Sequence, residues 1–159
     1  ITAALLTKIA PSTSSCISAP ILSECANATV AAPAIVRSFN NYDITSLGEQ
    51  AALISLILYE SGDFKYNKNH FPPPGVPGQG TRNMQSAKYN EMYAREIGIE
   101  DPMLDENASF GSAAWFLTTQ CTEEVRRGLE SGEKEEYRVY LEDCVGTRDT
   151  EEREKVWEK

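Results

Sequence analysis

The stretch SLGEQAALISLILYESG, residues Ser46–Gly62, decides the fold, because it is the most apolar helical segment of the chain. It opens with a capping box, in which the Ser46 hydroxyl accepts an N–H of the first turn and Glu49 reaches back to the N–H of the cap. It closes with Gly62, a residue suited to the left-handed position that ends a helix. We therefore predict a central, buried helix that ends at about Glu60.

The rest of the chain also has the pattern of helices. Strict alternation of apolar and polar residues, which indicates strands, is scarce, and helix caps recur. We predict an all-α fold with little or no sheet, in a single domain over residues 1–159. We divide it into N-terminal helices and loop (1–45), a core part (46–121) and charged C-terminal helices (122–159). Further helices are expected at about 2–9, 29–39 and 84–97, and after Asn107, Thr122, Gly132 and Thr150.

The composition argues against several classes of partner. The net charge is −9, whereas a nucleic-acid surface needs clustered Lys and Arg. The same charge gives no attraction to an anionic membrane, and no apolar run approaches the roughly 20 residues that cross a bilayer. We identify no cofactor motif and no metal site, since His70 is the only histidine. We expect a monomer with no nucleic-acid partner, no membrane and no cofactor.

The cysteines indicate disulfides. Cys16, Cys25, Cys121 and Cys144 are even in number and lack the Cys-x-x-Cys spacing of zinc sites. Four cysteines allow three pairings. We favour Cys16–Cys25 and Cys121–Cys144, because each pair closes a short loop around an expected turn.

Two glycosylation sequons, at Asn27 and Asn107, agree with secretion. The chain begins with Ile1 instead of Met, which suggests that a leader has been removed. Together with the cysteines, these features predict a secreted, extracellular protein.

Glu60 is a candidate catalytic acid. The residues seven, four and three positions before it share its helix face, and Leu53, Leu56 and Ile57 are all apolar. A carboxylate at this end of a helix meets the negative end of the dipole, and burial penalises its ionised form. Both effects favour the protonated acid that proton donation requires. The alternative is an ordinary glutamate that points into water.

A long loop follows the predicted helix. Residues 63–83 are rich in proline and glycine, which favour irregular backbone. Loops of this length tend to be functional. We expect His70 to lie exposed in it. Tyr66 could stack on a substrate or pin the loop to the core. Arg82 could pair with a carboxylate of a substrate or be a surface charge.

Three ordered segments resemble the soluble lytic transglycosylases and goose-type lysozymes. They are ALISLILYESG (52–62), GQGTRNMQ (78–85) and NASFGSAAWFLTTQC (107–121), so the resemblance covers about residues 46–121. Glu60-Ser61-Gly62 match the first motif of the group, and Met84 and Gln85 match the end of the second. The later Ala-Tyr-Asn-like motif is absent, although Tyr137 and Tyr140 lie in about the right region.

The resemblance implies a secreted, lysozyme-like enzyme of fungal type. In that group a single glutamate acts as the catalytic acid. Here Glu60 would protonate the glycosidic oxygen of peptidoglycan, a polysaccharide. The expected substrate-binding residues are Gln85, Met84, Ser61, Tyr66, Arg82, Tyr137 and Tyr140. Two alternatives stay open: a non-catalytic glycan-binding or effector protein on the same fold, and a chitinase- or chitosanase-like hydrolase.

Overall fold

The computed structural model of residues 1–159 contains helices and no strand, which confirms the all-α prediction. Two isolated bridges, Lys68 with Gly80 and Gly80 with Gln85, are the only β-type pairings. The helices are α1 (Ala3–Ile9), α2 (Ala28–Asn41), α3 (Leu47–Glu60), α4 (Ala87–Ile97), α5 (Glu106–Gln120), α6 (Glu123–Glu130), α7 (Lys134–Val139) and α8 (Glu151–Trp157). Short helical turns occupy Pro11–Ser14, Leu22–Glu24 and Tyr140–Val145 (η3).

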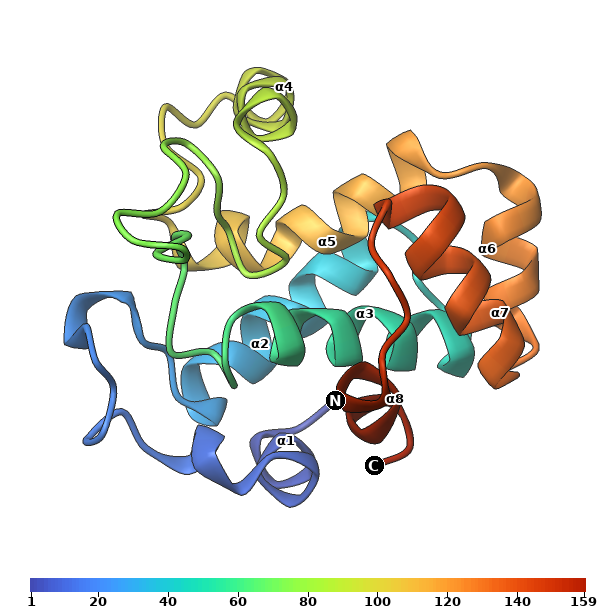
Figure 1. The fold of residues 1–159 in the computed structure, drawn as a ribbon, viewed down its shortest axis with the longest axis horizontal. Helices are drawn as coiled ribbons and strands as arrows, with labels where there is room; N and C mark the ends of the chain where they lie inside the picture. The colour runs from blue at the N-terminus through green and yellow to red at the C-terminus, as the bar shows by residue number, and fades with distance from the viewer.

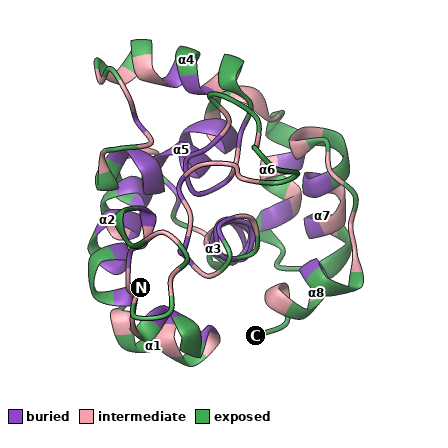
Figure 2. Ribbon diagram, turned by 60° about the vertical axis from the view of Figure 1, so that its left-hand side comes forward, coloured by how far each residue is buried: buried purple, intermediate pink, exposed green.

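Helix α3 lies at the centre of the molecule, with α2 and α5 beside it, α6 and α7 at one end and α8 across it (Figure 1). Every residue from Ala52 to Leu58 is buried. The main hydrophobic cluster has 26 buried residues and includes every residue of this run except Ser55. Figure 2 shows the buried residues in purple. Helix α4 projects from the body of the molecule and is mostly exposed (Figure 2). None of the helices combines the length and apolarity needed to span a bilayer.

The cap of α3 differs in one detail from the predicted capping box. The Ser46 hydroxyl accepts the Glu49 N–H at 3.1 Å, as expected. The Glu49 carboxylate, however, accepts a hydrogen bond from the Ser46 hydroxyl and pairs with Arg126 of α6 at 2.9 Å. A guanidinium is a stronger partner for a carboxylate than a neutral N–H, so the glutamate ties α3 to α6 instead of closing its own cap.

The end of α3 agrees with the prediction and adds a sharp turn. Ser61 is the C-cap, and Gly62 has a φ of 58° in the left-handed region. Asp63 and Phe64 follow with φ values of 58° and 67°. This turn carries the Phe64 ring back into the core, where its centroid lies 5.2 Å from that of Phe110.

Two helix starts differ from the sequence prediction. Helix α4 begins at Ala87 and not at Met84, because Met84 has a φ of 51°, which a right-handed helix does not accept. Helix α5 is capped by Asp105, whose carboxylate accepts the Ala108 N–H at 2.8 Å, and not by Asn107. The loop between α3 and α4 therefore runs to Ser86.

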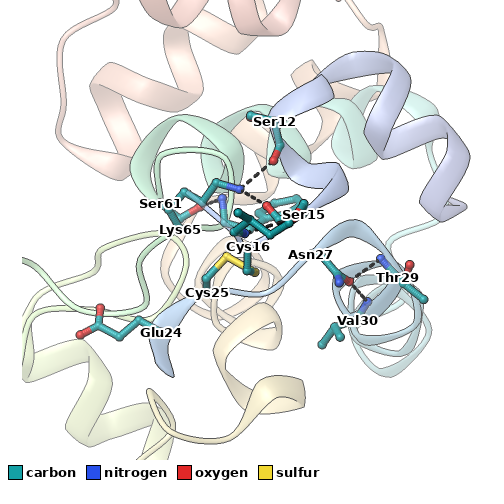
Figure 3. Close-up of a disulfide and its surroundings, with 12 residues drawn as sticks. Ser12, Ser15, Cys16, Glu24, Cys25, Asn27, Thr29, Val30, Ser61 and Lys65 are labelled. Atoms are coloured by element: carbon teal, nitrogen blue, oxygen red, sulfur yellow. Dashed lines mark hydrogen bonds between the residues drawn. A yellow bond between two sulfur atoms is a disulfide. The ribbon is translucent and has the colours of Figure 1, made fainter. Parts of the chain in front are cut away.

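The two disulfides join the cysteines in the favoured pairs, Cys16–Cys25 and Cys121–Cys144. The first closes the loop that precedes α2 (Figure 3). Next to it, the Lys65 ammonium donates to the carbonyl oxygens of Ser12 and Ser15, each at 2.7 Å (Figure 3). The N-terminal loop is thus fastened to the turn that follows α3.

We predict that Gly48→Ala destabilises the fold, because the close packing of α3 on α6 depends on this glycine. An added Cβ at Gly48 would lie 1.8 Å from the carbonyl oxygen of Leu129, which is backbone and cannot rotate away. The expected loss in the free energy of unfolding is about 1 to 3 kcal/mol, as for other overpacked sites, measured by urea titration. Lys88→Ala, on the exposed surface of α4, is the control and should change it by less than about 0.5 kcal/mol. A Gly48→Ala protein as stable as the wild type would contradict this account.

Candidate functional site

A cleft of about 330 Å³ lies where α3 ends. The loop that leads to α4, helices α4, α5 and α8, and the segment after η3 complete its walls. Its apolar lining consists of Leu56, Met84, Tyr89, Phe116 and Val145, and its polar lining includes Glu60, Asn83, Gln85, Thr147 and Arg153. A larger and more open hollow, about 730 Å³, runs along α4 and holds none of the predicted site residues. The cleft is therefore the candidate site.

Glu60 is paired in this cleft with a residue from the other end of the chain. Its Oε1 lies 2.5 Å from Nη2 of Arg153, on α8. The same nitrogen donates to the Thr147 hydroxyl at 3.2 Å, and the guanidinium lies 4.2 Å from the centre of the Tyr59 ring. The arginine side chain is 8% exposed and the glutamate 20%. Glu60 therefore sits in an ion pair at the edge of solvent, and not alone among apolar side chains as the sequence suggested.

The ion pair leaves part of the hydrogen-bonding capacity of Arg153 and Glu60 unused. Nη1 of Arg153 is buried and has no partner in the protein. Oε2 of Glu60 takes no part in the contact with Arg153. A buried N–H without an acceptor costs free energy, so an oxygen atom of a ligand would be favourable beside it. The pair thus offers one donor and one acceptor next to apolar walls.

Two of the predicted binding residues, Met84 and Gln85, do line the cleft. The Gln85 amide is held on both sides, since its nitrogen donates to Asn90 at 2.7 Å and its oxygen accepts from Asn83 at 3.3 Å. Among the apolar lining residues, the rings of Tyr89 and Phe116 meet edge to face with centroids 5.0 Å apart. The polar and apolar walls are both fixed by neighbours.

Ser61 and Tyr66 lie outside the cleft. The Ser61 hydroxyl is fully buried, donates to the Ile57 carbonyl at 2.6 Å and accepts the Phe64 N–H at 2.9 Å, so it closes the end of α3. The Tyr66 ring lies against Phe71, with centroids 6.2 Å apart, and helps to hold the loop. Neither is placed to touch a ligand beside Glu60.

Tyr137 and Tyr140 belong to the core. They are 1% and 0% exposed. The Tyr137 hydroxyl hydrogen-bonds with that of Ser55 at 3.0 Å, and its ring stacks on Trp157 at 4.5 Å between centroids. Burial raises the pKa of Tyr137 to about 12 and also raises the pKa of Tyr140. Both rings support α3 and η3 from the inside.

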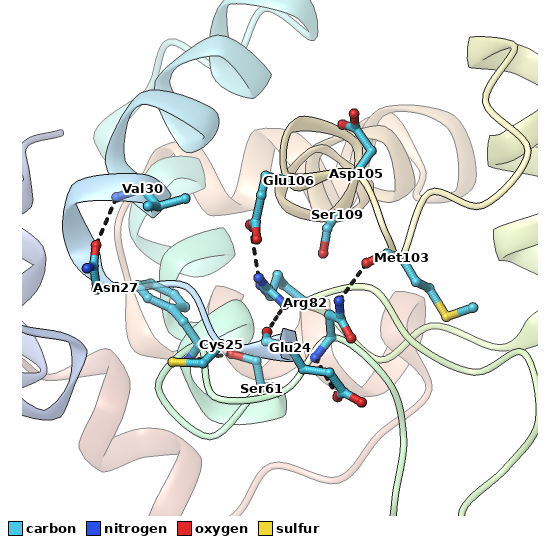
Figure 4. A network of polar contacts seen from close by, with 12 residues as sticks. Glu24, Cys25, Asn27, Val30, Ser61, Arg82, Met103, Asp105, Glu106 and Ser109 are labelled. Carbon is cyan, nitrogen blue, oxygen red and sulfur yellow. Dashed lines mark hydrogen bonds and ion pairs between the residues drawn. The ribbon is translucent and has the colours of Figure 1, made fainter. Parts of the chain in front are cut away.

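Arg82 is completely buried and serves as a structural tie (Figure 4). Its guanidinium donates to the Glu24 carbonyl and to the Glu106 carboxylate, each at 3.0 Å, and lies 4.7 Å from the centre of the Phe110 ring. Burial lowers the pKa of Arg82, and the Glu106 charge acts in the opposite direction. The side chain joins the loop before α2 to the start of α5, away from the cleft.

His70 was predicted to lie exposed in solvent, but the structure shows it paired with a carboxylate. Its Nε2 lies 3.0 Å from both carboxylate oxygens of Glu24, and its side chain is 31% exposed. The sequence gives no sign of this pair, because the two residues are 46 positions apart. The contact fastens the proline-rich loop to the disulfide loop.

The sequons differ in their surroundings. The Asn27 side chain caps α2 by accepting the N–H groups of Thr29 and Val30, at 3.1 and 3.2 Å. Asn107 is exposed on α5, but the hydroxyl-bearing residue of its sequon, Ser109, is 1% exposed. Glycosylation at both positions stays a prediction.

The most important residue missed by the sequence reading is Arg153. It lies in a strongly charged segment, and nothing in that segment distinguishes it from the exposed Lys155 on the same helix. Its partner Glu60 is 93 positions away. In the sequence, only Thr150 indicates that this helix forms, as a residue suited to a helix cap. In the structure its hydroxyl accepts the Arg153 N–H at 3.4 Å.

Comparison with known proteins adds one relative. No family model matches the chain, and no solved structure matches it. A bifunctional dioxygenase (DOX)-epoxy alcohol synthase (EAS) from Fusarium oxysporum (strain Fo5176) is 41% identical over 141 residues. The match covers 75% of this chain and 11% of the relative, so the chain spans about a tenth of that protein's length.

This relative corrects the lysozyme-like interpretation. It is an enzyme, but its name describes a dioxygenase and an epoxy alcohol synthase, and neither is a glycan-cleaving activity. The resemblance to lytic transglycosylases and goose-type lysozymes was therefore wrong, and so were the peptidoglycan, chitin and glycan-binding functions inferred from it. The motif Glu60-Ser61-Gly62, which carried part of the resemblance, is explained by the end of α3.

The chain's own residues do not fit a metal centre held by three or more side-chain ligands. No three His, Cys, Asp or Glu residues are grouped as potential ligands. All four cysteines are in disulfides, and the single histidine faces a carboxylate. We therefore derive no oxygen-activating step from these residues.

We predict that Arg153→Met lowers the free energy of unfolding by about 2 kcal/mol, less than for a fully buried pair because Glu60 can reach water. Methionine keeps an apolar stem against Tyr59, so the change reports mainly on the charge. In a cycle with Glu60→Gln, the coupling energy should be about 1 kcal/mol, from chemical denaturation of all four proteins.

Lys155→Met is the matched control on the same helix. Lys155 is 62% exposed and pairs only with Glu151, so its loss should change stability by less than about 0.5 kcal/mol. A coupling energy near zero between Glu60 and Arg153 would show that the ion pair does not stabilise the fold, and it would contradict this prediction.

Proposed function

We propose that this chain is a helical ligand-binding domain of an oxygenase of the dioxygenase–epoxy alcohol synthase kind. The observation that carries the proposal is the 41% identity over 141 residues with the Fusarium oxysporum enzyme. The ligand that we assign to the cleft is an epoxy alcohol, or a molecule with the same pair of oxygen groups. This assignment joins the printed activity of the relative to the chemistry of the cleft.

The oxygen groups of an epoxy alcohol are complementary to the ion pair. The hydroxyl is a donor, and Oε2 of Glu60 is an acceptor outside the contact with Arg153. The epoxide oxygen is an acceptor only, and Nη1 of Arg153 is a buried donor without a partner. One ligand could therefore satisfy both groups at once.

The remaining walls suit the hydrocarbon part of such a ligand. Leu56, Met84, Tyr89 and Phe116 line the cleft beside the ion pair. The volume, about 330 Å³, is near the lower end of small-molecule sites, which span about 300 to 1,000 Å³. A compact epoxy alcohol is thus better matched to the cleft than a long polymer.

This domain would bind and orient the molecule, while oxygen activation would take place outside it. The support is the composition of the chain, whose cysteines are oxidised and whose histidine is engaged with Glu24. A secreted location is also part of the proposal, because disulfides persist mainly in oxidising compartments. A monomeric state stays a prediction.

The test is calorimetric titration of the chain with two epoxy alcohols, glycidol and the larger epoxygeraniol, and with an epoxide that lacks the hydroxyl. We expect epoxygeraniol to bind more tightly than glycidol, because it adds apolar contact. Glu60→Gln should weaken epoxygeraniol binding about tenfold, since a charged acceptor is replaced by a neutral one. The epoxide without a hydroxyl should bind Glu60→Gln and wild type equally.

Glu91→Gln is the control, because Glu91 lies on α4 away from the cleft and pairs with Arg95. It should leave all three titrations unchanged. The proposal would be contradicted if neither epoxy alcohol gave a binding signal at millimolar concentration. It would also be contradicted if Glu91→Gln weakened epoxygeraniol binding as much as Glu60→Gln does.

A further inference from the structure

The disulfide between Cys121 and Cys144 forms part of the wall of a hollow that is separate from the cleft. The hollow has a volume of about 470 Å³, and its other walls come from the start of α6, from α7 and from η3. Both cysteines are half-buried, so a small molecule in this hollow can reach the disulfide. We call it the disulfide hollow.

The disulfide hollow is acidic. Its lining includes Glu124, Glu136 and Asp143 and contains no Lys, Arg or His. Glu124 is paired with Arg127 at 3.6 Å, whereas Glu136 and Asp143 are in no ion pair. A disulfide is opened by a thiolate, which is negatively charged. The carboxylates therefore repel an anionic thiol and favour a thiol that also carries a positive group.

The two sulfur atoms lie at different helix ends. Helix α7 and η3 follow one another without a break, and Cys144 lies in the last turn of this helical segment. Negative charge is unfavourable there, because the C-terminal end of a helix is the negative end of its dipole. Cys121 lies between the C-terminal end of α5 and the N-terminal end of α6, where the two dipoles oppose each other. Cys121 is therefore the better leaving group.

The same disulfide joins two walls of the cleft. Cys121 directly follows α5, which carries Phe116, and Cys144 directly precedes the segment 145–147. Phe116 and all three residues of this segment line the cleft. The segment also holds Arg153, whose Nη2 donates to the hydroxyl of Thr147 at 3.2 Å. Opening the disulfide would thus remove the covalent tie between these walls.

We propose that Cys121–Cys144 is a thiol-exchange site that takes small thiols bearing a positive charge, and that its opening loosens the wall of the cleft. The incoming thiolate bonds to Sγ of Cys144, and the bond between the two cysteines breaks. The electron pair stays on Sγ of Cys121, which takes a proton from water. The proposal does not depend on the ligand assigned to the cleft.

A second molecule of the small thiol completes the reduction. It attacks the sulfur of the first molecule, releases Cys144, which takes a proton, and leaves as the disulfide of the small thiol. The protein gains two electrons, which the two thiol molecules supply. The volume of the disulfide hollow, about 470 Å³, lies within the range of small-molecule sites.

The first test compares a cationic thiol, cysteamine, with an anionic one, 2-mercaptoethanesulfonate, at equal thiolate concentrations and low salt. Peptide mass spectrometry follows each disulfide separately. We expect Cys121–Cys144 to open about fivefold faster with cysteamine, and the difference to shrink at high salt. The first adduct should be on the peptide that contains Cys144.

The other disulfide of the chain is an internal comparison. The charges near Cys16–Cys25 are mixed, because the Lys65 ammonium lies beside it and the Asp63 carboxylate accepts a hydrogen bond from Ser12 (Figure 3). The preference for cysteamine should therefore be smaller at this disulfide.

Charge variants test the role of the carboxylates. Asp143→Asn should reduce the preference for cysteamine at Cys121–Cys144 to about twofold, since one of the two unpaired charges is removed. Glu91→Gln is the matched control, because it removes a carboxylate from α4, outside the disulfide hollow. It should leave the preference unchanged.

Hydrogen exchange tests the effect on the cleft. The N–H groups of Gly146 and Thr147 both donate to the Leu141 carbonyl. In the double variant Cys121→Ser/Cys144→Ser, these two amides should exchange about tenfold faster, because the segment has lost its tie to α5. The amides of residues 52–58 in α3 should exchange as in the wild type, and Cys16→Ser/Cys25→Ser should leave both regions unchanged.

Several results would overturn the proposal. Equal rates with the two thiols at Cys121–Cys144, or a preference that Asp143→Asn does not change, would remove the role of the acidic lining. A first adduct on Cys121 would reverse the assigned direction of attack. Exchange that rises in α3 as much as in residues 145–147 would make the disulfide a support of the whole fold and not of the cleft wall.

Discussion

The constraint on which the rest of the structure depends is the burial of α3. A helix that is apolar on every side must be covered on every side, and here seven consecutive residues, Ala52 to Leu58, are buried. No single neighbour can do this, so α5, α6 and α8 each contact a different part of the helix. The close approach of α6 requires Gly48, where any Cβ would meet the Leu129 carbonyl. The arrangement of these helices around α3 meets this requirement.

The polar groups at the two ends of α3 are satisfied by cations from the C-terminal part of the chain. Glu49 is paired with Arg126 of α6, and Glu60 with Arg153 of α8. Because a carboxylate at the C-terminal end of a helix meets the negative end of the dipole, the second pair compensates an unfavourable position. This compensation leaves one arginine donor, Nη1, without a partner in the protein.

The fold class, the central helix and the disulfide pairs could be predicted because they follow from local patterns. The Ser46 cap, the apolar run and Gly62 specify α3 within a window of 17 residues. The contacts that define the cleft could not be predicted, because Arg153 and Glu60 are 93 positions apart. Arg82 and Tyr137 were misread for a related reason. Their residue types suit a binding site, but only the packing shows that they are enclosed by protein.

The functional interpretation was wrong where it relied on short motifs. Glu60-Ser61-Gly62 has a sufficient structural reason: the serine closes the helix, and the glycine takes the left-handed position. A match of this kind reports on how a helix ends. The agreement with the Fusarium oxysporum relative covers 75% of this chain, far more than any short motif.

The position of α8 has a consequence for when the two hollows exist. This helix has seven residues, and it lines two different spaces, with Arg153 on the cleft and Trp157 on a separate hollow between α1, α3 and α8. Local opening of a single short helix requires less free energy than global unfolding. Each undocking of α8 would remove a wall from both hollows in the same event, so their lifetimes are set by one local equilibrium. Hydrogen exchange of the amides of α8 would report on that equilibrium directly.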